Sequence, residues 1–374
     1  MLRISCLVIC MFFGHISHAF SLKNTENQNP KIQLALLLDV SNSMDGLIDQ
    51  AKAQLWKIVN ELAGMEQNGN PADIELSLYT FGDDRLLAKD GYIKQWNAFS
   101  NDLDLISQNL FALTTSGGEE YCGWTLADAV DDLNWTGRAS DLQIIVIAGN
   151  ESFAQGTKNY IESCKRSNQN NIIVNTIFCG HCPDGKSLFW EDAAIRGQGK
   201  YMCIDQDQQI EYIATPYDSL INDQNNKLND TYIGYGAIGS KRKEMQLIQD
   251  DEASSFSSSN MTERVLSKSS RAYSNASWDI LDLYNEDKEA VLKLEDEMLP
   301  EGLKGKSKKE KIDYLERLRA ERKNIQTSIG SLSKERAVFI EQYRAENSTT
   351  ENSLDAAMLS LIRAQASEIG FSKK

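Results

Sequence analysis

The chain has 374 residues, of which 41% are hydrophobic, and it carries a formal net charge of −15 at pH 7. This length allows a sizeable hydrophobic core and two domains. The acidic balance excludes general binding to nucleic acids or anionic membranes, because both partners would be repelled at long range.

The first residues have the pattern of a secretory signal peptide. The basic residue Arg3 precedes the apolar run Ile4 to Phe13, and small residues stand at Ser17 and Ala19. This pattern predicts a signal peptide over 1–19, cleaved after Ala19, and a short linker over 20–30. The apolar run is too short for a stable membrane anchor, and no later stretch is long enough to span a bilayer. We therefore expect a secreted or periplasmic protein that is not an integral membrane protein.

The most informative motif follows the first predicted strand. The apolar strand Gln33 to Asp39 leads directly into the pattern Asp-x-Ser-x-Ser, formed by Asp39, Ser41 and Ser43. An amphipathic helix begins immediately after it. A strand end before a helix N-terminus brings a carboxylate and two hydroxyls together, and these hard oxygen donors suit a divalent cation. The alternative without a metal is a capped helix start, with Ser41 or Ser43 as the N-cap.

In this setting, Asp-x-Ser-x-Ser resembles the metal-ion-dependent adhesion site of von Willebrand factor A (vWA) domains. The resemblance covers residues 31–222. It implies a doubly wound, mostly parallel α/β sheet with helices on both faces and a metal at the carboxyl edge of the strands. The alternation of strands and helices agrees with this fold class. Further strands are predicted at Ile74–Phe81, Gly91–Trp96, Leu142–Ala148 and Asn171–Phe178, and helices at Leu103–Leu113, Thr125–Leu133, Thr157–Lys165 and Leu188–Ile195.

The family's third metal ligand is a Thr in a loop before a helix. Counting back from Leu126 in this chain places Glu120 at that position. Integrin β subunits, which belong to the same superfamily, use a Glu in this loop as a direct ligand. The resemblance therefore implies that Glu120 replaces the Thr, with Glu119 and Thr115 as alternatives.

The family's last ligand is an Asp after the fourth strand. Gly149 occupies its place here, followed by Asn150 and Glu151, which could reach the metal or its waters. The resemblance thus implies an altered site whose metal ligands are Ser41, Ser43, Glu120 and, through water, Asp39. Two carboxylates would neutralise a divalent ion, so Ca²⁺ or Mn²⁺ suits the site as well as Mg²⁺. The same neutralisation would weaken the attraction of a partner's acidic group.

Five of the seven cysteines lie beyond the predicted signal peptide, and in an oxidising compartment disulfides are the default interpretation. We predict a Cys182–Cys203 bridge, and a second bridge between Cys122 and Cys179, which both belong at the carboxyl rim. The run Cys179-Gly-His-Cys182 resembles the active site of protein disulfide isomerases. Pro183 then breaks the long helix that lowers the first thiol's pKa in such proteins. A structural disulfide is therefore favoured over redox catalysis.

The composition changes after residue 222. Residues 223–270 are rich in Ser and polar groups, which predicts a linker with short helices, followed by a helical region over 271–374. Apolar residues in steps of three and four form a heptad seam. Its members are Leu318, Arg322, Ile325, Ile329, Leu332, Arg336, Phe339 and Tyr343. The seam predicts a helical hairpin packed on Ala290–Met298 or Leu354–Ala364, and a coiled-coil dimer is the alternative.

These patterns predict a protein-binding or adhesion module outside the cytoplasm that uses a divalent cation at the edge of its sheet. Its partner would be a protein or a cell-surface ligand and not a nucleic acid. We do not expect an enzyme, because His181 is the one histidine beyond the predicted signal peptide. Two alternatives remain. Gly149 favours a metal-free scaffold that binds partners through its helical region, and Cys179 with Cys182 favours a thiol–disulfide oxidoreductase.

Overall fold

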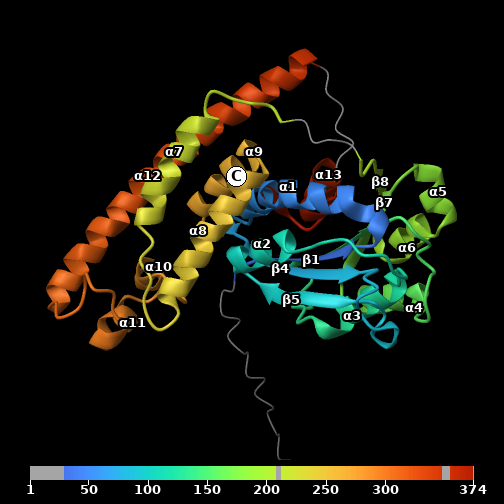
Figure 1. Ribbon diagram of the computed structural model, residues 1–374, viewed down its shortest axis with the longest axis horizontal. Helices are drawn as coiled ribbons and strands as arrows, with labels where there is room; N and C mark the ends of the chain where they lie inside the picture. Colours follow the sequence, from blue (N-terminus) through green and yellow to red (C-terminus); the bar gives the residue numbers. More distant parts are fainter. Residues whose placement is uncertain (1–28, 208–211, 348–353, 374) are drawn as a thin grey trace, which may run out of the picture.

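The structure is a computed structural model that describes residues 29–207, 212–347 and 354–373. The predicted signal peptide, residues 1–19, lies outside these ranges. An α/β domain built on one large sheet stands beside a group of helices, and the long helix α12 (Lys308–Asn347) runs along those helices (Figure 1). None of the helices in the described ranges is long and apolar enough to cross a bilayer.

The large sheet has six strands in the order β5-β4-β1-β6-β7-β8. Their bounds are β5 Lys94–Ser100, β4 Asp73–Phe81, β1 Lys31–Asp39, β6 Leu142–Gly149, β7 Ile173–Cys179 and β8 Gln198–Ile204. All neighbours are parallel except β4 and β5, which pair antiparallel at the edge. This is the doubly wound order, in which ligands bind where the strand order reverses, here between β1 and β6.

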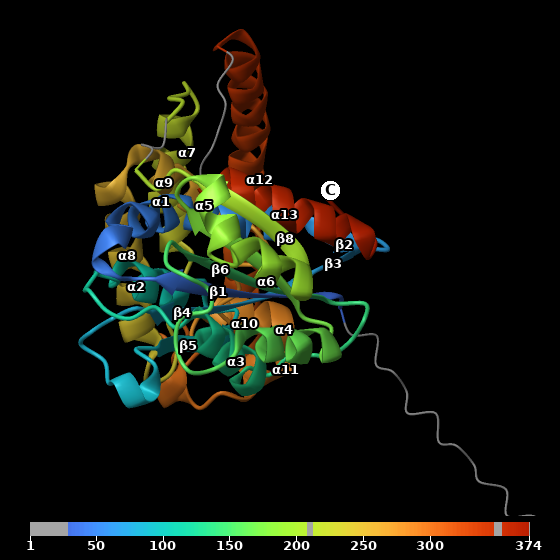
Figure 2. The same cartoon turned by 90° about the vertical axis from the view of Figure 1, so that its right-hand side faces the viewer.

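Helices cover both faces of the sheet (Figure 2). One face carries α1 (Asp45–Ala63), α2 (Leu103–Phe111) and α13 (Leu354–Glu368); the other carries α3 (Cys122–Asp132), α4 (Tyr160–Gln169) and α6 (Trp190–Arg196), while the short α5 (Cys182–Ser187) adjoins α6. The side chains of β1 alternate between two cores: Leu36 and Leu38 pack on one face, Ala35 and Leu37 on the other. Such burial on both sides explains the unbroken apolar run. The predicted fold class is confirmed.

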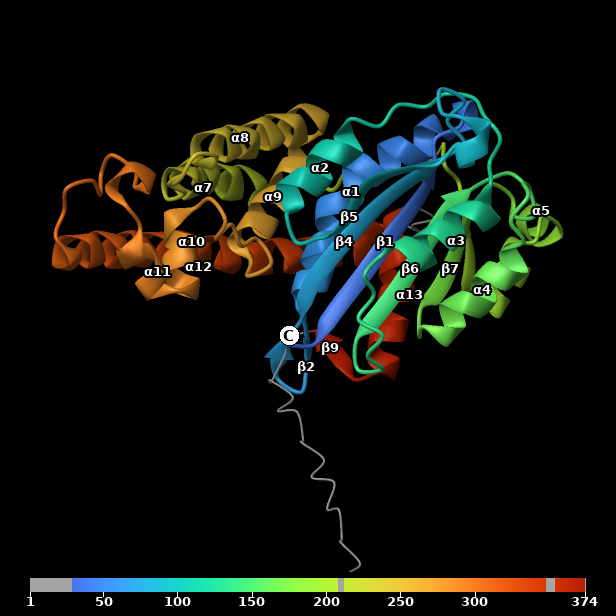
Figure 3. The same cartoon turned by 90° about the horizontal axis from the view of Figure 1, so that it is seen from below.

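Between β8 and α13 the chain leaves the sheet and forms helices, which we call the helical insertion (residues 212–347). It contains α7 (Asp218–Asp230), α8 (Gly239–Phe256), α9 (Ser258–Ser269), α10 (Ile280–Glu286), α11 (Lys288–Lys293) and α12. Figure 3 shows the insertion extending to one side of the sheet. For 223–270 the composition predicts a linker with short helices, and the structure has most of α7, all of α8 and all of α9 in this segment.

These helices look like a linker in the sequence because they pack through buried polar side chains. Lys268 is fully buried, and its ammonium group donates to Asp250 Oδ2 at 2.7 Å and to Asn225 Oδ1 at 2.9 Å. Asn229 Nδ2 donates to the same Asp250 oxygen at 2.7 Å. Buried polar groups with complete hydrogen bonding can specify one arrangement of helices without an apolar stripe.

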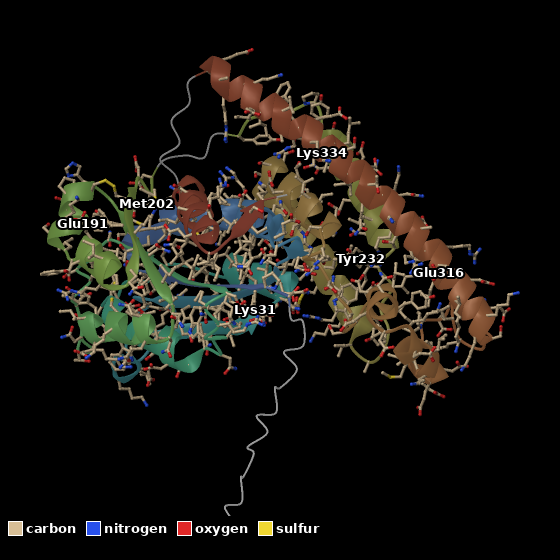
Figure 4. All side chains as sticks on the ribbon, turned by 180° about the vertical axis from the view of Figure 1, so that it is seen from behind. Lys31, Glu191, Met202, Tyr232, Glu316 and Lys334 are labelled. Carbon is tan, nitrogen blue, oxygen red and sulfur yellow. A yellow bond between two sulfur atoms is a disulfide. The ribbon has the colours of Figure 1, made fainter. Side chains whose placement is uncertain are left out.

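The predicted seam of α12 packs within the chain. Its apolar members Ile325 and Ile329 are buried, and α12 contacts α7, α9 and α10. The two arginines of the seam are also buried. Arg322 pairs with Asp279 at 2.9 Å and its guanidinium lies 3.9 Å from the ring centre of Tyr232, a residue labelled among the helices in Figure 4. The seam therefore packs on helices of the same chain, and Leu318 shares a hydrophobic core with Val291 of the predicted partner segment Ala290–Met298.

The end of the chain returns to the α/β domain. Helix α13 packs on α1 and on β8, and strand β9 (Phe371–Lys373) pairs with β2 (Met65–Gln67), which also pairs with β3 (Asn70–Pro71). The sequence places this segment in a separate C-terminal helical region. In the structure its apolar face covers the sheet, so residues from both ends of the chain build one core.

Arg264 joins the insertion to the α/β domain. Its fully buried guanidinium lies 2.5 Å from Asp250 in α8 and 3.0 Å from Asp104 in α2, and 4.8 Å from the ring centre of Trp56 in α1. A buried charge with two carboxylate partners is costly to disturb, because removing it leaves both acids buried without their cation.

We expect Arg264→Met to lower the free energy of unfolding by about 3–5 kcal/mol, the cost typical of breaking a buried ion pair. Arg271→Met is the matched control, because Arg271 makes a half-exposed pair with Asp73 at 2.5 Å. Such exposed pairs contribute about 0–1 kcal/mol. Urea unfolding of both variants checks this. Equal losses would show that the buried arginine does not hold the insertion in place.

Candidate metal centre

The motif residues lie where β1 ends at the carboxyl edge of the sheet. Asp39 is the last residue of β1 and is fully buried, and its Oδ1 accepts a hydrogen bond of 2.8 Å from the backbone N–H of Ser41. The hydroxyls of Ser41 and Ser43 are 3.4 Å apart. Ser41 stands at the N-cap of the short 3₁₀ turn Asn42–Met44 without a side-chain capping bond. The Ser41 side chain therefore does not cap this turn, as the interpretation without a metal would require.

Glu120 reaches the same point from the loop before α3. This residue is 4% exposed, and its backbone N–H donates to Gln155 Oε1 at 2.7 Å. Gly82, directly after β4, packs against the cluster with a φ of +81°. A Cβ added there would lie 2.9 Å from Asp39 Oδ1, 3.1 Å from Glu120 Cγ and 3.4 Å from Ser41 Cβ. These three side chains therefore surround one point above Gly82.

The alternative ligands in the same loop lie elsewhere. The Thr115 hydroxyl donates to Asp45 at the start of α1, and the Glu119 side chain is exposed to solvent. Of the three candidates, Glu120 is thus the one placed beside Asp39. Its role as a metal ligand stays a prediction.

The two buried carboxyl groups lie beside each other above Gly82, and this proximity affects the ionisation of both groups. Burial, together with the neighbouring Asp39, raises the pKa of Glu120 to about 9. Burial also raises the pKa of Asp39. Two adjacent buried carboxylates cannot both ionise without a compensating cation, so the pair holds a proton at neutral pH when it binds no ion.

Three buried oxygens at this point have no hydrogen-bond partner: Asp39 Oδ2, Glu120 Oε2 and Asn150 Oδ1. Buried polar atoms are normally paired, so such a group of acceptors indicates a site for a bound cation. Within the described residues, no three His, Cys, Asp or Glu side chains are grouped for metal binding. The donor set here is instead two carboxylates with serine and amide oxygens, which fits a hard divalent ion.

Gly149 lies at the end of β6, where the family has an Asp. A Cβ at this position would lie 3.0 Å from Asp39 Oδ2 and 3.2 Å from the ring of the buried Trp190. The close packing explains why a glycine is present. Asn150 follows it, and its Nδ2 lies 3.1 Å from Ser43 Oγ, to which it donates. Asn150 thereby connects the β6 loop to the motif.

Gly82 and Gln155 are the site residues that the sequence interpretation missed. The signal for Gly82 was its position directly after an apolar strand, beside the pair Asp83 and Asp84. Gln155 holds the Glu120 backbone, and no local pattern distinguishes it from other loop glutamines.

One disulfide prediction is confirmed and the other is wrong. Cys182 is bonded to Cys203, with their α-carbons 5.4 Å apart, and Figure 4 shows this bond as yellow sticks near Met202. Cys122 and Cys179 are free buried thiols. They belong to cores on opposite faces of the sheet, which keeps them from pairing. Burial raises the pKa of the Cys179 thiol well above its ordinary value, the opposite of an activated redox cysteine.

No protein-family model and no curated protein matches the chain. Solved structures similar to it include the SpRpn10 VWA domain, at 20% identity, covering 49% of this chain and 91% of that domain with a TM-score of 0.36. BatB from Bacteroides thetaiotaomicron is 15% identical, with coverage of 46% and 90% and a TM-score of 0.36. PTMP1 from the mussel byssus, in a structure described as having a zinc-occupied MIDAS motif, is 12% identical. That match covers 48% of this chain and 43% of PTMP1, with a TM-score of 0.36.

A vWA domain is thus among the solved structures that are similar to this chain. The strand order and the antiparallel edge strand define the class independently: a doubly wound α/β domain with its polar cluster at the carboxyl edge.

The raised pKa of Glu120 predicts how the stability of the folded protein changes with pH when a chelator keeps the site free of metal ions. The folded-state pKa of about 9 lies above the ordinary value of 4.5, so the folded state holds this proton more tightly than the unfolded chain. Stability from this group is complete below the ordinary pKa and is lost as the pH rises through the folded-state pKa. We therefore expect the melting temperature in EDTA to fall as the pH rises toward 9.

Glu120→Gln should reduce this fall, because an amide needs no proton, whereas Glu119→Gln should leave it unchanged. Adding Ca²⁺ to the wild-type protein at about pH 8 should raise the melting temperature, since the ion replaces the shared proton. An identical pH profile for the wild-type protein and Glu120→Gln would contradict the carboxyl pair.

Proposed function

We propose that this protein is an extracytoplasmic protein-binding module whose α/β domain uses a divalent cation at the carboxyl edge of its sheet. Ser41, Ser43 and Glu120 would hold the ion, and Asp39 would act through a water. The observation that carries the proposal is the set of buried, unpaired oxygens on Asp39, Glu120 and Asn150. When bound, the ion would compensate the two buried carboxylates and hold the motif loops together at the edge of the sheet.

The donor chemistry narrows the choice of ion. Carboxylate, hydroxyl and amide oxygens are hard ligands that suit Mg²⁺, Ca²⁺ and Mn²⁺. Glu120 and Asp39 together would balance a divalent charge. This balance favours firm binding of the ion. A site with mainly hydroxyl ligands would instead hold an electron-poor ion.

The location outside the cytoplasm is supported by two observations. The N-terminal sequence has the signal-peptide pattern described above, and Cys182–Cys203 is a disulfide of the kind that persists in oxidising compartments.

A metal-free module that binds partners through its helical insertion is the second candidate. It is favoured by Gly149 at the usual ligand position and by the pKa of Glu120 near 9, because a proton shared by the two carboxyl groups could stabilise them without an ion. Direct ion titration distinguishes the two candidates.

We expect calorimetry to show one divalent ion bound per chain with a Kd below about 1 mM, a range typical of extracellular oxygen-ligand sites. Asp39→Asn preserves the side-chain shape and should weaken binding at least about tenfold, or 1.4 kcal/mol. Asp251→Asn, on the exposed side of α8, is the matched control and should bind like the wild-type protein. If Mg²⁺, Ca²⁺ and Mn²⁺ all fail to bind near this concentration, the metal-free module becomes the better description.

A further inference from the structure

The loops around the candidate metal centre carry many more acidic side chains than basic ones. We call residues 39–45, 82–85, 114–121 and 149–152 the site rim. The rim has seven carboxylates and one basic side chain, Arg85. The carboxylates belong to Asp39, Asp45, Asp83, Asp84, Glu119, Glu120 and Glu151.

A bound ion would leave most of this charge in place. Asp39 and Glu120 would balance the ion, and their buried, unpaired oxygens locate it at the centre of the rim. Asp83 is already neutralised by Arg85, with contacts of 2.7 and 2.8 Å between the guanidinium and the carboxylate. The charges that remain belong to side chains nearer the solvent.

Four exposed carboxylates make up this remainder: Asp45, Asp84, Glu119 and Glu151. Asp45 accepts a hydrogen bond from a threonine hydroxyl, and Asp84 accepts one of 2.5 Å from a serine hydroxyl. Hydroxyl donors are neutral, so neither hydrogen bond supplies a counter-charge to these aspartates. Exposed carboxylates within about 8–10 Å of an approaching group act on it at physiological ionic strength.

Aromatic rings stand beside the acidic rim. Tyr121 directly follows Glu120, and its ring stacks on Trp124 at a centroid distance of 6.2 Å and meets Tyr92 edge-on at 5.6 Å. The chain places one of its own cations here: Lys158 Nζ lies 4.6 Å from the ring centre of Trp124 and 2.6 Å from the carboxylate of Asp128. An aromatic face beside a carboxylate is a favourable setting for a lysine or arginine side chain.

We propose that the partner of this site presents lysine or arginine side chains, as a basic segment of a protein, to the acidic rim. The inference rests on the proposed function, because it assigns the charge of the partner that the ion-bound module binds. A carboxylate from a partner would meet an ion that is already balanced, inside a ring of negative charges. A basic segment would be steered toward the rim and held by Glu119, Glu151 and the adjacent rings.

The test uses two capped peptides of equal length, one alternating lysine with glycine and the other alternating glutamate with glycine. Each carries a fluorophore, and anisotropy measures its affinity for the full chain saturated with Ca²⁺. We expect the lysine peptide to bind and the glutamate peptide to bind at least about tenfold more weakly. The affinity for the lysine peptide should fall as salt is added.

Two triple variants separate the rim from the general acidity of the chain. Asp84→Asn, Glu119→Gln and Glu151→Gln together remove three rim charges. Asp251→Asn, Glu252→Gln and Glu289→Gln together remove three exposed charges from the helical insertion. The rim variant should lose most of its affinity for the lysine peptide, and the insertion variant should stay within about twofold of the wild-type protein.

Equal losses in both variants, or tighter binding of the glutamate peptide, would overturn the inference. Calorimetric ion binding by the same samples keeps the two proposals distinct. A wild-type protein that binds Ca²⁺ but prefers the glutamate peptide contradicts only the basic partner. A protein that binds no divalent ion contradicts the proposed function.

Discussion

The organisation of this protein depends on one constraint: two carboxyl groups, Asp39 and Glu120, are buried against each other at the carboxyl edge of a parallel sheet. Two adjacent, buried like charges must be compensated by a proton or by a cation. The surrounding structure fixes the pair from several sides. Ser41 donates its backbone N–H to Asp39, and the glycines Gly82 and Gly149 allow the β4 and β6 loops to approach closely. The ends of three neighbouring strands, β1, β4 and β6, therefore surround two buried carboxyl groups whose charge must be compensated.

The remainder of the chain is arranged around the same domain. The helical insertion leaves after β8, and the chain returns as α13 to complete one face of the sheet. Arg264 pairs with Asp104 in α2 and links the insertion to the domain, whereas Arg322–Asp279 and Arg336–Asp218, the latter at 2.8 Å, join parts of the insertion to each other. Gln206, just after β8, donates to the backbone oxygen of Ser43 at 2.8 Å. The segment that leads from β8 into the insertion therefore contacts the Asp-x-Ser-x-Ser motif.

The sequence was most informative where burial is apolar. The strands and the Asp-x-Ser-x-Ser motif could be predicted because their hydrophobic runs are continuous, and counting along a loop placed Glu120. The helices α7 to α9 could not, because polar residues such as Asn225 and Asp250 form their packing surface and resemble a linker. The Cys122–Cys179 pairing failed for a different reason, since proximity to the same sheet edge does not specify the face on which a side chain lies.

The central claim is that a divalent ion compensates the buried carboxyl pair. Anomalous diffraction from crystals soaked in Mn²⁺ tests it most directly, because Mn²⁺ accepts the same oxygen ligands and its position can be located independently of the protein atoms. The account predicts one strong anomalous peak in contact with Ser41, Ser43 and Glu120, with a water between the ion and Asp39. A map with no peak at this point, in crystals whose Mn²⁺ concentration far exceeds about 1 mM, would contradict the account.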